Sequence, residues 1–261
     1  FTWKDMLDFY TCTECGRCSD NCPATLTGKK LSPKHYTLDL RDHLYSLQEK
    51  VAKATDVGAP GESAEAQAAE LTAAAADGSQ QPDEVKPGGG GVAAQRDLVP
   101  DIIDPDVLWA CTTCRACEEQ CPVNITYVDK IVQMRRNLVV IRGEFPAELN
   151  KPFEGMEVNG NPWNLSRMDR ANWAEGLGVR MAAEHPTAEV LFWVGCAASY
   201  DDRAKKIARA TAQLLTAAGV DYDILGEEET CTGDPARRAG NEYLFSMLAE
   251  TNVATLSGYR E

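Results

Sequence analysis

The spacing of apolar and polar positions predicts two helices in the N-terminal half of the chain. Leucines recur near helical spacing over residues 34–53, and Ser32 and Pro33 suit the start of a helix. A second apolar stripe predicts a helix over residues 125–142, which Gly143 ends.

The C-terminal part alternates between short apolar runs and amphipathic stretches. It predicts a strand over 190–194, a helix over 201–218, a strand over 220–225 and a helix over 241–256. Alternating strands and helices favour parallel α/β packing. Because two strands make a small sheet on their own, we expect further chain after residue 261 or a partner to complete it.

Between the two N-terminal helices the periodic pattern stops. Residues 54–97 are rich in Ala, Gly, Glu, Gln and Pro, include the glycine run 88–91, and contain almost nothing to bury. This composition predicts a flexible low-complexity insert, with one Ala-rich helix over 63–76. Residues 144–187 form a proline-containing connector with short helical pieces.

Length and charge narrow the class of protein. The 261 residues suffice for one large or two small domains. The formal charge of -14 argues against a nucleic-acid partner, whose phosphates need a basic surface.

No apolar run approaches the roughly 18 residues that span a bilayer. Phe1 is not a natural start residue, so we expect a piece of a longer chain and leave an upstream membrane segment open.

Eight of the ten cysteines fall in two tight runs. Residues 11–24 read TCTECGRCSDNCPA and residues 110–123 read ACTTCRACEEQCPV. Both contain the spacing C-x2-C-x2-C-x3-C-P. A secreted disulfide scaffold would spread its cysteines through a much shorter chain. Clustered cysteines in a domain of ordinary composition indicate metal ligands in a reducing compartment.

The spacing fits cubane iron–sulfur clusters, in which each of four irons takes one thiolate. Three closely spaced cysteines in a tight loop reach three irons, and the cysteine before proline ligates the other cluster in two-cluster ferredoxins. This rule assigns the ligands crosswise, with Cys12, Cys15, Cys18 and Cys121 on one [4Fe–4S] cluster and Cys22, Cys111, Cys114 and Cys117 on the second. The sequence therefore predicts an electron-transfer protein.

A structural zinc site is the alternative from a different class of function. Zinc sites use paired C-x2-C knuckles with a longer gap between them, whereas this chain repeats three evenly spaced cysteines and a Cys-Pro. A zinc-stabilised scaffold would have no redox activity and no colour, while a cluster protein is brown and bleaches with dithionite.

The gap between the runs is much longer than in a compact bacterial ferredoxin, and a predicted helix follows each run. This arrangement resembles the α-helical ferredoxin module of succinate dehydrogenase and heterodisulfide reductase subunits. The paired motif resembles the heterodisulfide-reductase-related iron–sulfur proteins when it is taken together with residues 161–164, 170–173 and 190–239. Within that group it resembles above all the membrane-bound electron-transfer-flavoprotein:(methyl)menaquinone oxidoreductases, and residues 229–238 are the most specific piece.

The resemblance implies an α+β chain, in which an α-helical ferredoxin domain with two [4Fe–4S] clusters precedes a partial α/β cysteine-rich domain. The expected boundaries are 1–53 with 98–143 for the ferredoxin domain, 54–97 for the insert, 144–187 for the connector and 188–261 for the first half of the cysteine-rich domain.

The resemblance also implies an oxidoreductase component that passes electrons from a reduced flavoprotein, such as an electron-transfer flavoprotein, toward a membrane quinone. It implies haem b in a membrane partner or domain, and a place on the cytoplasmic side of the membrane through that partner or a missing segment. The alternatives are the iron–sulfur subunit of a heterodisulfide reductase or of a lactate, glycolate or glycerol-3-phosphate dehydrogenase. The sequence identifies no catalytic residue.

Two isolated cysteines match the related cysteine-rich domains. Cys196 and Cys231 occupy the first two cysteine places of that pattern. Position 232 is Thr where the double-cysteine form has a second Cys, and no C-x2-C follows before Glu261. We therefore expect an incomplete third metal site and no third cluster in this sequence alone, with a third iron–sulfur site only in a longer chain. The alternative is that both residues are buried thiols.

Overall fold

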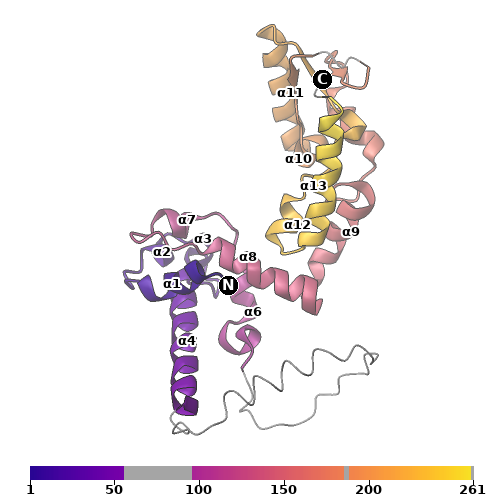
Figure 1. The fold of residues 1–261 in the computed structure, drawn as a ribbon. Coiled ribbons are helices and arrows are strands. Elements are labelled where there is room, and N and C mark those ends of the chain that lie inside the picture. Colours follow the sequence, from indigo (N-terminus) through magenta and orange to yellow (C-terminus); the bar gives the residue numbers. More distant parts are fainter. Residues whose placement is uncertain (56–95, 185–187, 260–261) are drawn as a thin grey trace, which may run out of the picture. The chain divides into compact units, whose positions relative to one another are not determined.

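The computed structural model describes residues 1–55, 96–184 and 188–259 (Figure 1). Apart from its ends, the predicted insert at 54–97 lies outside the described residues. The chain divides into two compact units, Phe1–Tyr127 and Val128–Glu261. Over the described residues no helix has the length and apolar character needed to cross a membrane.

The regular elements that the structure describes in the first unit are all helices. Its α-helices and its π-helix η1 are α1 (Trp3–Thr11), α2 (Arg17–Asp20), α3 (Pro23–Leu26), α4 (Pro33–Thr55), η1 (Leu98–Ile102), α6 (Pro105–Trp109) and α7 (Ala116–Glu119). Helix α4 confirms the helix predicted over 34–53. Leu31, just before α4, packs in the core with Cys22 and Ala24, and Val107 and Cys111 lie against them.

The second unit holds the remaining helices. They are α8 (Val128–Arg136), the π-helix η2 (Asn137–Arg142), η3 (Ala147–Leu149), α9 (Asn150–Asn159), η4 (Arg167–Ala174), α10 (Cys196–Tyr200), α11 (Asp202–Ala217), η5 (Gly226–Glu228), α12 (Asp234–Arg238) and α13 (Glu242–Ser257). Helices α11 and α13 confirm the helices predicted over 201–218 and 241–256 within one residue at each end.

The helix predicted over 125–142 begins three residues late, at Val128. The reason lies in the preceding backbone amides. The N–H groups of Ile125, Thr126 and Tyr127 donate to Cys121 Sγ and to the carboxylates of Asp8 and Glu118, respectively. These side-chain acceptors hold residues 124–127 in an irregular segment, so the helix starts only after them.

The second unit contains a small parallel sheet. Its strand order is β1–β3–β2, with β1 at Arg180–Met181, β2 at Val190–Leu191 and β3 at Tyr222–Ile224. Both predicted strands are confirmed in position and are shorter than expected. Strand β1 lies unpredicted inside the expected connector, because two residues carry too little pattern to read. The sheet packs with α11 and η4 around Trp173, Ala212 and Ile224.

Candidate metal centres

The two cysteine runs fold into the same backbone shape. Glu14 and Thr113 have φ values of +56° and +57°, and Gly16 and Arg115 have +84° and +61°. These positions correspond in the two copies of the motif. Left-handed residues bend the chain sharply, so each loop curls around its own cysteines. The third cysteine then enters a four-residue helix, α2 or α7, and is buried there.

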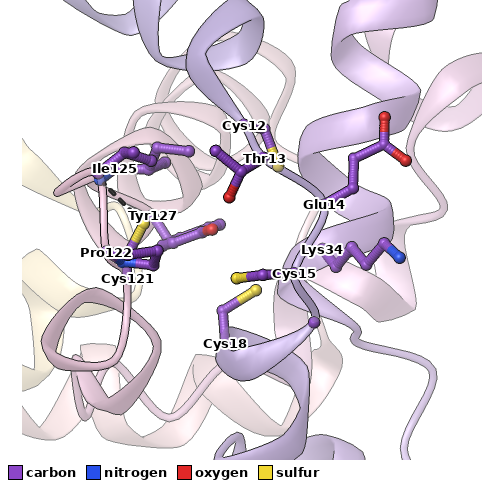
Figure 2. A pocket seen from close by; sticks show the side chains of 12 residues that line it. Cys12, Thr13, Glu14, Cys15, Cys18, Lys34, Cys121, Pro122, Ile125 and Tyr127 are labelled. Atoms are coloured by element: carbon purple, nitrogen blue, oxygen red, sulfur yellow. Dashed lines mark hydrogen bonds between the residues drawn. The ribbon is translucent and has the colours of Figure 1, made fainter.

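The first three cysteines of the N-terminal run share a pocket with the last cysteine of the second run. Figure 2 shows Cys12, Cys15, Cys18 and Cys121 around one space, which Tyr127 also lines. Cys121 is far away in the sequence, so its presence results from the fold. This set of four thiols fits the donors that a cubane cluster needs.

Backbone amides point at the sulfur atoms of this pocket. The N–H of Ile125 donates to Cys121 Sγ over 3.3 Å. The Arg17 N–H lowers the pKa of Cys15 by the same kind of bond, whereas burial raises the pKa of Cys12 despite a bond from the Glu14 N–H. Such donors stabilise negative charge on sulfur.

The remaining motif cysteines come together in the complementary way. Cys22 belongs to a small buried core against which Cys111 packs. Burial, followed by the negative charges of Glu118, Cys111 and Cys22, raises the pKa of Cys117 to about 12. Cys22 therefore lies near the second run and does not line the pocket formed by the first three cysteines of its own run. Cys114 is exposed, as is its counterpart Cys15 in the first run.

Two side chains at the first pocket were not anticipated from the sequence. Tyr127 is buried and forms a hydrogen bond with Cys18, while burial raises the pKa of its hydroxyl. Lys34 also lines the pocket. Lys30, which the sequence places near the first run, is paired with Asp104 and Asp106 at 2.7 Å instead. No local signal distinguishes these lysines, because only the fold decides which one faces the cysteines.

The second unit brings Cys196 and Cys231 together. Strands β2 and β3 are parallel neighbours, and each cysteine follows the end of one of them. The two thiols are hydrogen-bonded to each other. The Gly233 N–H approaches Cys231 Sγ at 3.5 Å. Over the residues that the structure describes, no group of three or more His, Cys, Asp or Glu side chains is arranged to hold a single metal ion.

A buried ion pair lies beside these two cysteines. Arg170 and Glu229 are each 2% exposed and are joined at 2.7 Å. Arg170 also donates to Cys196 Sγ at 3.3 Å and to the carbonyl oxygen of Thr230. The hydrogen bond from Cys231, and then the charge of Arg170, lower the pKa of Cys196 to about 7. The sequence marks the segment around Arg170 only through a family resemblance, so it does not predict the contact with Cys196.

Comparison with known proteins identifies two modules in the chain. Residues 11–126 match the family model of a 4Fe-4S dicluster domain, and residues 190–260 match that of a cysteine-rich domain. These matches confirm the predicted fold class, a mostly helical chain with a small sheet and these two modules. No solved structure matches the chain.

Three relatives cover nearly the whole chain. The EtfAB:quinone oxidoreductase of Syntrophomonas wolfei is 40% identical over 99% of this chain and 35% of its own length. The probable iron-sulfur-binding oxidoreductase FadF of Bacillus subtilis is 42% identical over 97% of this chain and 36% of its own length. The probable membrane-anchored ferredoxin of Chromohalobacter salexigens is 37% identical over 100% of this chain and 36% of its own length.

The chain therefore spans about a third of the length of these relatives. Their names confirm the family resemblance predicted from the motifs. They also confirm the predicted class of protein, an iron–sulfur electron-transfer component of an oxidoreductase.

Proposed function

We propose that this chain is the iron–sulfur relay of an electron-transfer-flavoprotein:quinone oxidoreductase. It would pass electrons from a reduced flavoprotein, through two [4Fe–4S] clusters, toward a membrane quinone. The observation that carries the proposal is the crosswise gathering of cysteines, in which Cys121 joins the first run and Cys22 joins the second. An electron relay needs two clusters close to each other. Because each cysteine run supplies ligands to both clusters, the two runs keep the clusters close together.

The chain's own residues would hold and tune these centres. In the first pocket, Cys12, Cys15, Cys18 and Cys121 supply four thiolates, and the amide of Ile125 stabilises their charge. Hydrogen bonds and nearby cations favour the reduced, more negative state of a cluster. When bound, each cluster supplies a one-electron centre. The buried Tyr127 excludes water from one side of the pocket.

The partners form the finer part of the proposal. One relative's name joins EtfAB with quinone, and another's names a membrane anchor. We infer an electron-transfer flavoprotein as the donor, a haem b and quinone-reactive membrane partner or domain as the acceptor, and a place on the cytoplasmic side of that membrane. We also propose the sequence-derived domain boundaries, in which the ferredoxin domain runs to residue 143 and so extends past the first compact unit, which ends at Tyr127. Cys196 and Cys231 would complete a metal site only with ligands from elsewhere.

Metal content and donor specificity test this function together. Protein purified without oxygen should contain about eight irons and eight sulfides for its eight motif cysteines. Reduced electron-transfer flavoprotein should bleach the cluster absorbance in stopped flow, and should do so much faster than a flavodoxin at the same concentration. Stoichiometric zinc, or four irons, would exclude the two-cluster relay. Eight irons without reduction by the flavoprotein would retain the relay and exclude this donor.

A further inference from the structure

Helix α1 buries its polar side. Its buried residues include two aspartates, Asp5 and Asp8, which are 4% and 6% exposed. Asp5 forms a capping box with Thr2 at the start of the helix. Asp8 accepts hydrogen bonds from Lys4 at 2.7 Å and from the backbone N–H of Thr126 at 3.3 Å. The side of α1 that faces its own unit therefore buries two carboxylates together with one aromatic ring, that of Phe9, which is 1% exposed.

The opposite side of α1 is apolar and exposed. Trp3, Met6, Leu7 and Tyr10 are 78%, 37%, 50% and 44% exposed. Their spacing of i, i+3, i+4 and i+7 places them along one side of the helix, and we call these four residues the α1 stripe. Tyr10 also contacts the exposed ring of Tyr45 on α4, so the apolar surface continues onto a second helix.

The α1 stripe adjoins the first candidate cluster pocket. The helix ends at Thr11, and its C-cap residue is Cys12, which lines that pocket. Nine helical residues extend about 14 Å, so a partner seated on the stripe comes close to this centre. Trp, Tyr and Met are enriched in the cores of protein interfaces.

Size and charge indicate which kind of partner fits. Four such side chains form a patch on the order of 400 Å², below the roughly 800 Å² that each copy contributes to a stable dimer. A stable dimer of this chain through the stripe alone is therefore disfavoured, whereas contacts between electron-transfer partners fall at this low end of interface size. Helices that bind lipid surfaces carry many Lys and Arg on their polar face. Helix α1 has one lysine, paired with Asp8, and two aspartates, so a lipid surface is disfavoured as well.

We propose that the α1 stripe docks on an apolar helix surface of a membrane-embedded protein partner. The inference rests on the proposed function, because that function calls for an electron acceptor at the membrane. The stripe supplies the apolar contact, and the neighbouring Cys12 sets the first centre beside the acceptor.

A photo-crosslinking experiment tests the docking directly. Benzoylphenylalanine replaces Leu7 in one variant and Leu26 in the other, since Leu26 is a leucine of the same unit that is 71% exposed on α3. Both proteins are irradiated in membranes of cells that produce them, and cross-linked peptides are sequenced by mass spectrometry. We expect the probe at position 7 to join a peptide from an apolar helix of a membrane protein, at least tenfold more often than the probe at position 26.

The remaining results overturn the proposal. Cross-links from position 7 to phospholipid, to a second copy, or to the second unit of the same chain would each identify a different occupant. Equal yields from both positions would show that the stripe has no occupant.

The substitution Leu7→Glu separates this inference from the function on which it rests. It should lower recovery of the protein in the membrane fraction at least tenfold, while Leu26→Glu should not. Iron content and reduction by the flavoprotein should stay unchanged in both. Full membrane recovery of Leu7→Glu with intact iron would refute the docking and leave the relay standing. The protein could also bind protein-free phosphatidylcholine–phosphatidylglycerol vesicles, and Leu7→Glu could abolish this binding. That result would identify lipid, and not a protein, as the occupant of the α1 stripe.

Discussion

At the residue scale, the least expected feature is the full burial of Arg170 and Glu229 next to two cysteines. Both oxygens of Glu229 are engaged, because the N–H groups of Val194 and Gly195 donate to it along with Arg170. The Nε and Nη1 atoms of Arg170 have no hydrogen-bond partner among the described residues. A buried charge depends on its partner, since desolvation is costly for each ion alone.

Glu229→Gln should therefore destabilise the second unit by about 3–5 kcal/mol, the usual cost of removing one partner of a buried pair. The matched control is Glu227→Gln, which alters an exposed neighbour in the same segment and should change stability by less than about 0.5 kcal/mol. Urea unfolding followed by the fluorescence of the buried Trp173 measures the effect. Equal midpoints for the two variants would contradict a dependence of Arg170 on Glu229.

Crosswise ligation makes a second prediction about single residues. Cys22→Ser should alter the electron paramagnetic resonance signal that Cys114→Ser alters, because both residues are assigned to the second cluster. Cys22→Ser should leave unchanged the signal that Cys15→Ser alters. Cys196→Ser, in the other unit, serves as the control and should change neither signal. If the signals altered by Cys22→Ser and Cys15→Ser coincide, the ligands pair within each run and the crosswise assignment is wrong.

At the scale of elements, the end of α12 packs closely against α8. Gly240 follows α12 with φ +89°, and a Cβ atom there would lie 2.5 Å from the backbone of Arg135 and Arg136. Arg135 also donates to the carbonyl oxygen of Arg238 at 2.8 Å. Only glycine allows both the backbone conformation and the approach.

Gly240→Ala should cost the second unit roughly 3 kcal/mol of unfolding free energy, as left-handed strain and overpacking add together. Gly219→Ala isolates the first effect, because Gly219 has φ +73° and a Cβ atom added there would meet no described atom within 4 Å; it should cost about 1 kcal/mol. The denaturant midpoints of the two variants measure how much unfolding free energy each one loses. Similar losses would mean that α8 and α12 separate easily.

At the scale of the whole molecule, the two units differ in what stabilises them. In the first unit, Cys18, Cys22, Cys117 and Cys121 are themselves part of the buried core. In the second, the core around Trp173 and Ile224 consists of ordinary apolar side chains. Cluster ligands that also fill a core link metal content to folding.

Removal of iron with a chelator under reducing conditions should therefore loosen the first unit and spare the second. Hydrogen exchange followed by mass spectrometry should show lost protection in α4, with protection retained in α11 and α13. The intact holoprotein provides the reference for each peptide. Simultaneous loss in both units would show that they fold as one cooperative body, contrary to this expectation.

The sequence alone determined the cluster motif, the crosswise hypothesis and the long helices, and it gave the fold class through a family resemblance. The motif and the helices follow from short-range rules, because ligand spacing and helical periodicity are encoded within a few residues of one another. The same rules located β2 and β3 approximately but missed β1, whose two residues depend on pairing with β3.

Only the tertiary structure decided which side of each pattern faces inward. Periodicity in α1 shows that Trp3 and Leu7 share a side, and it would place that side in a core. The fold instead buries Asp5 and Asp8, because Lys4, Thr2 and Thr126 satisfy their charges and lone pairs. In the same way, the contact of Arg170 with Glu229 and Cys196 joins three distant segments. Such contacts are set by packing across the molecule, and no local pattern encodes them.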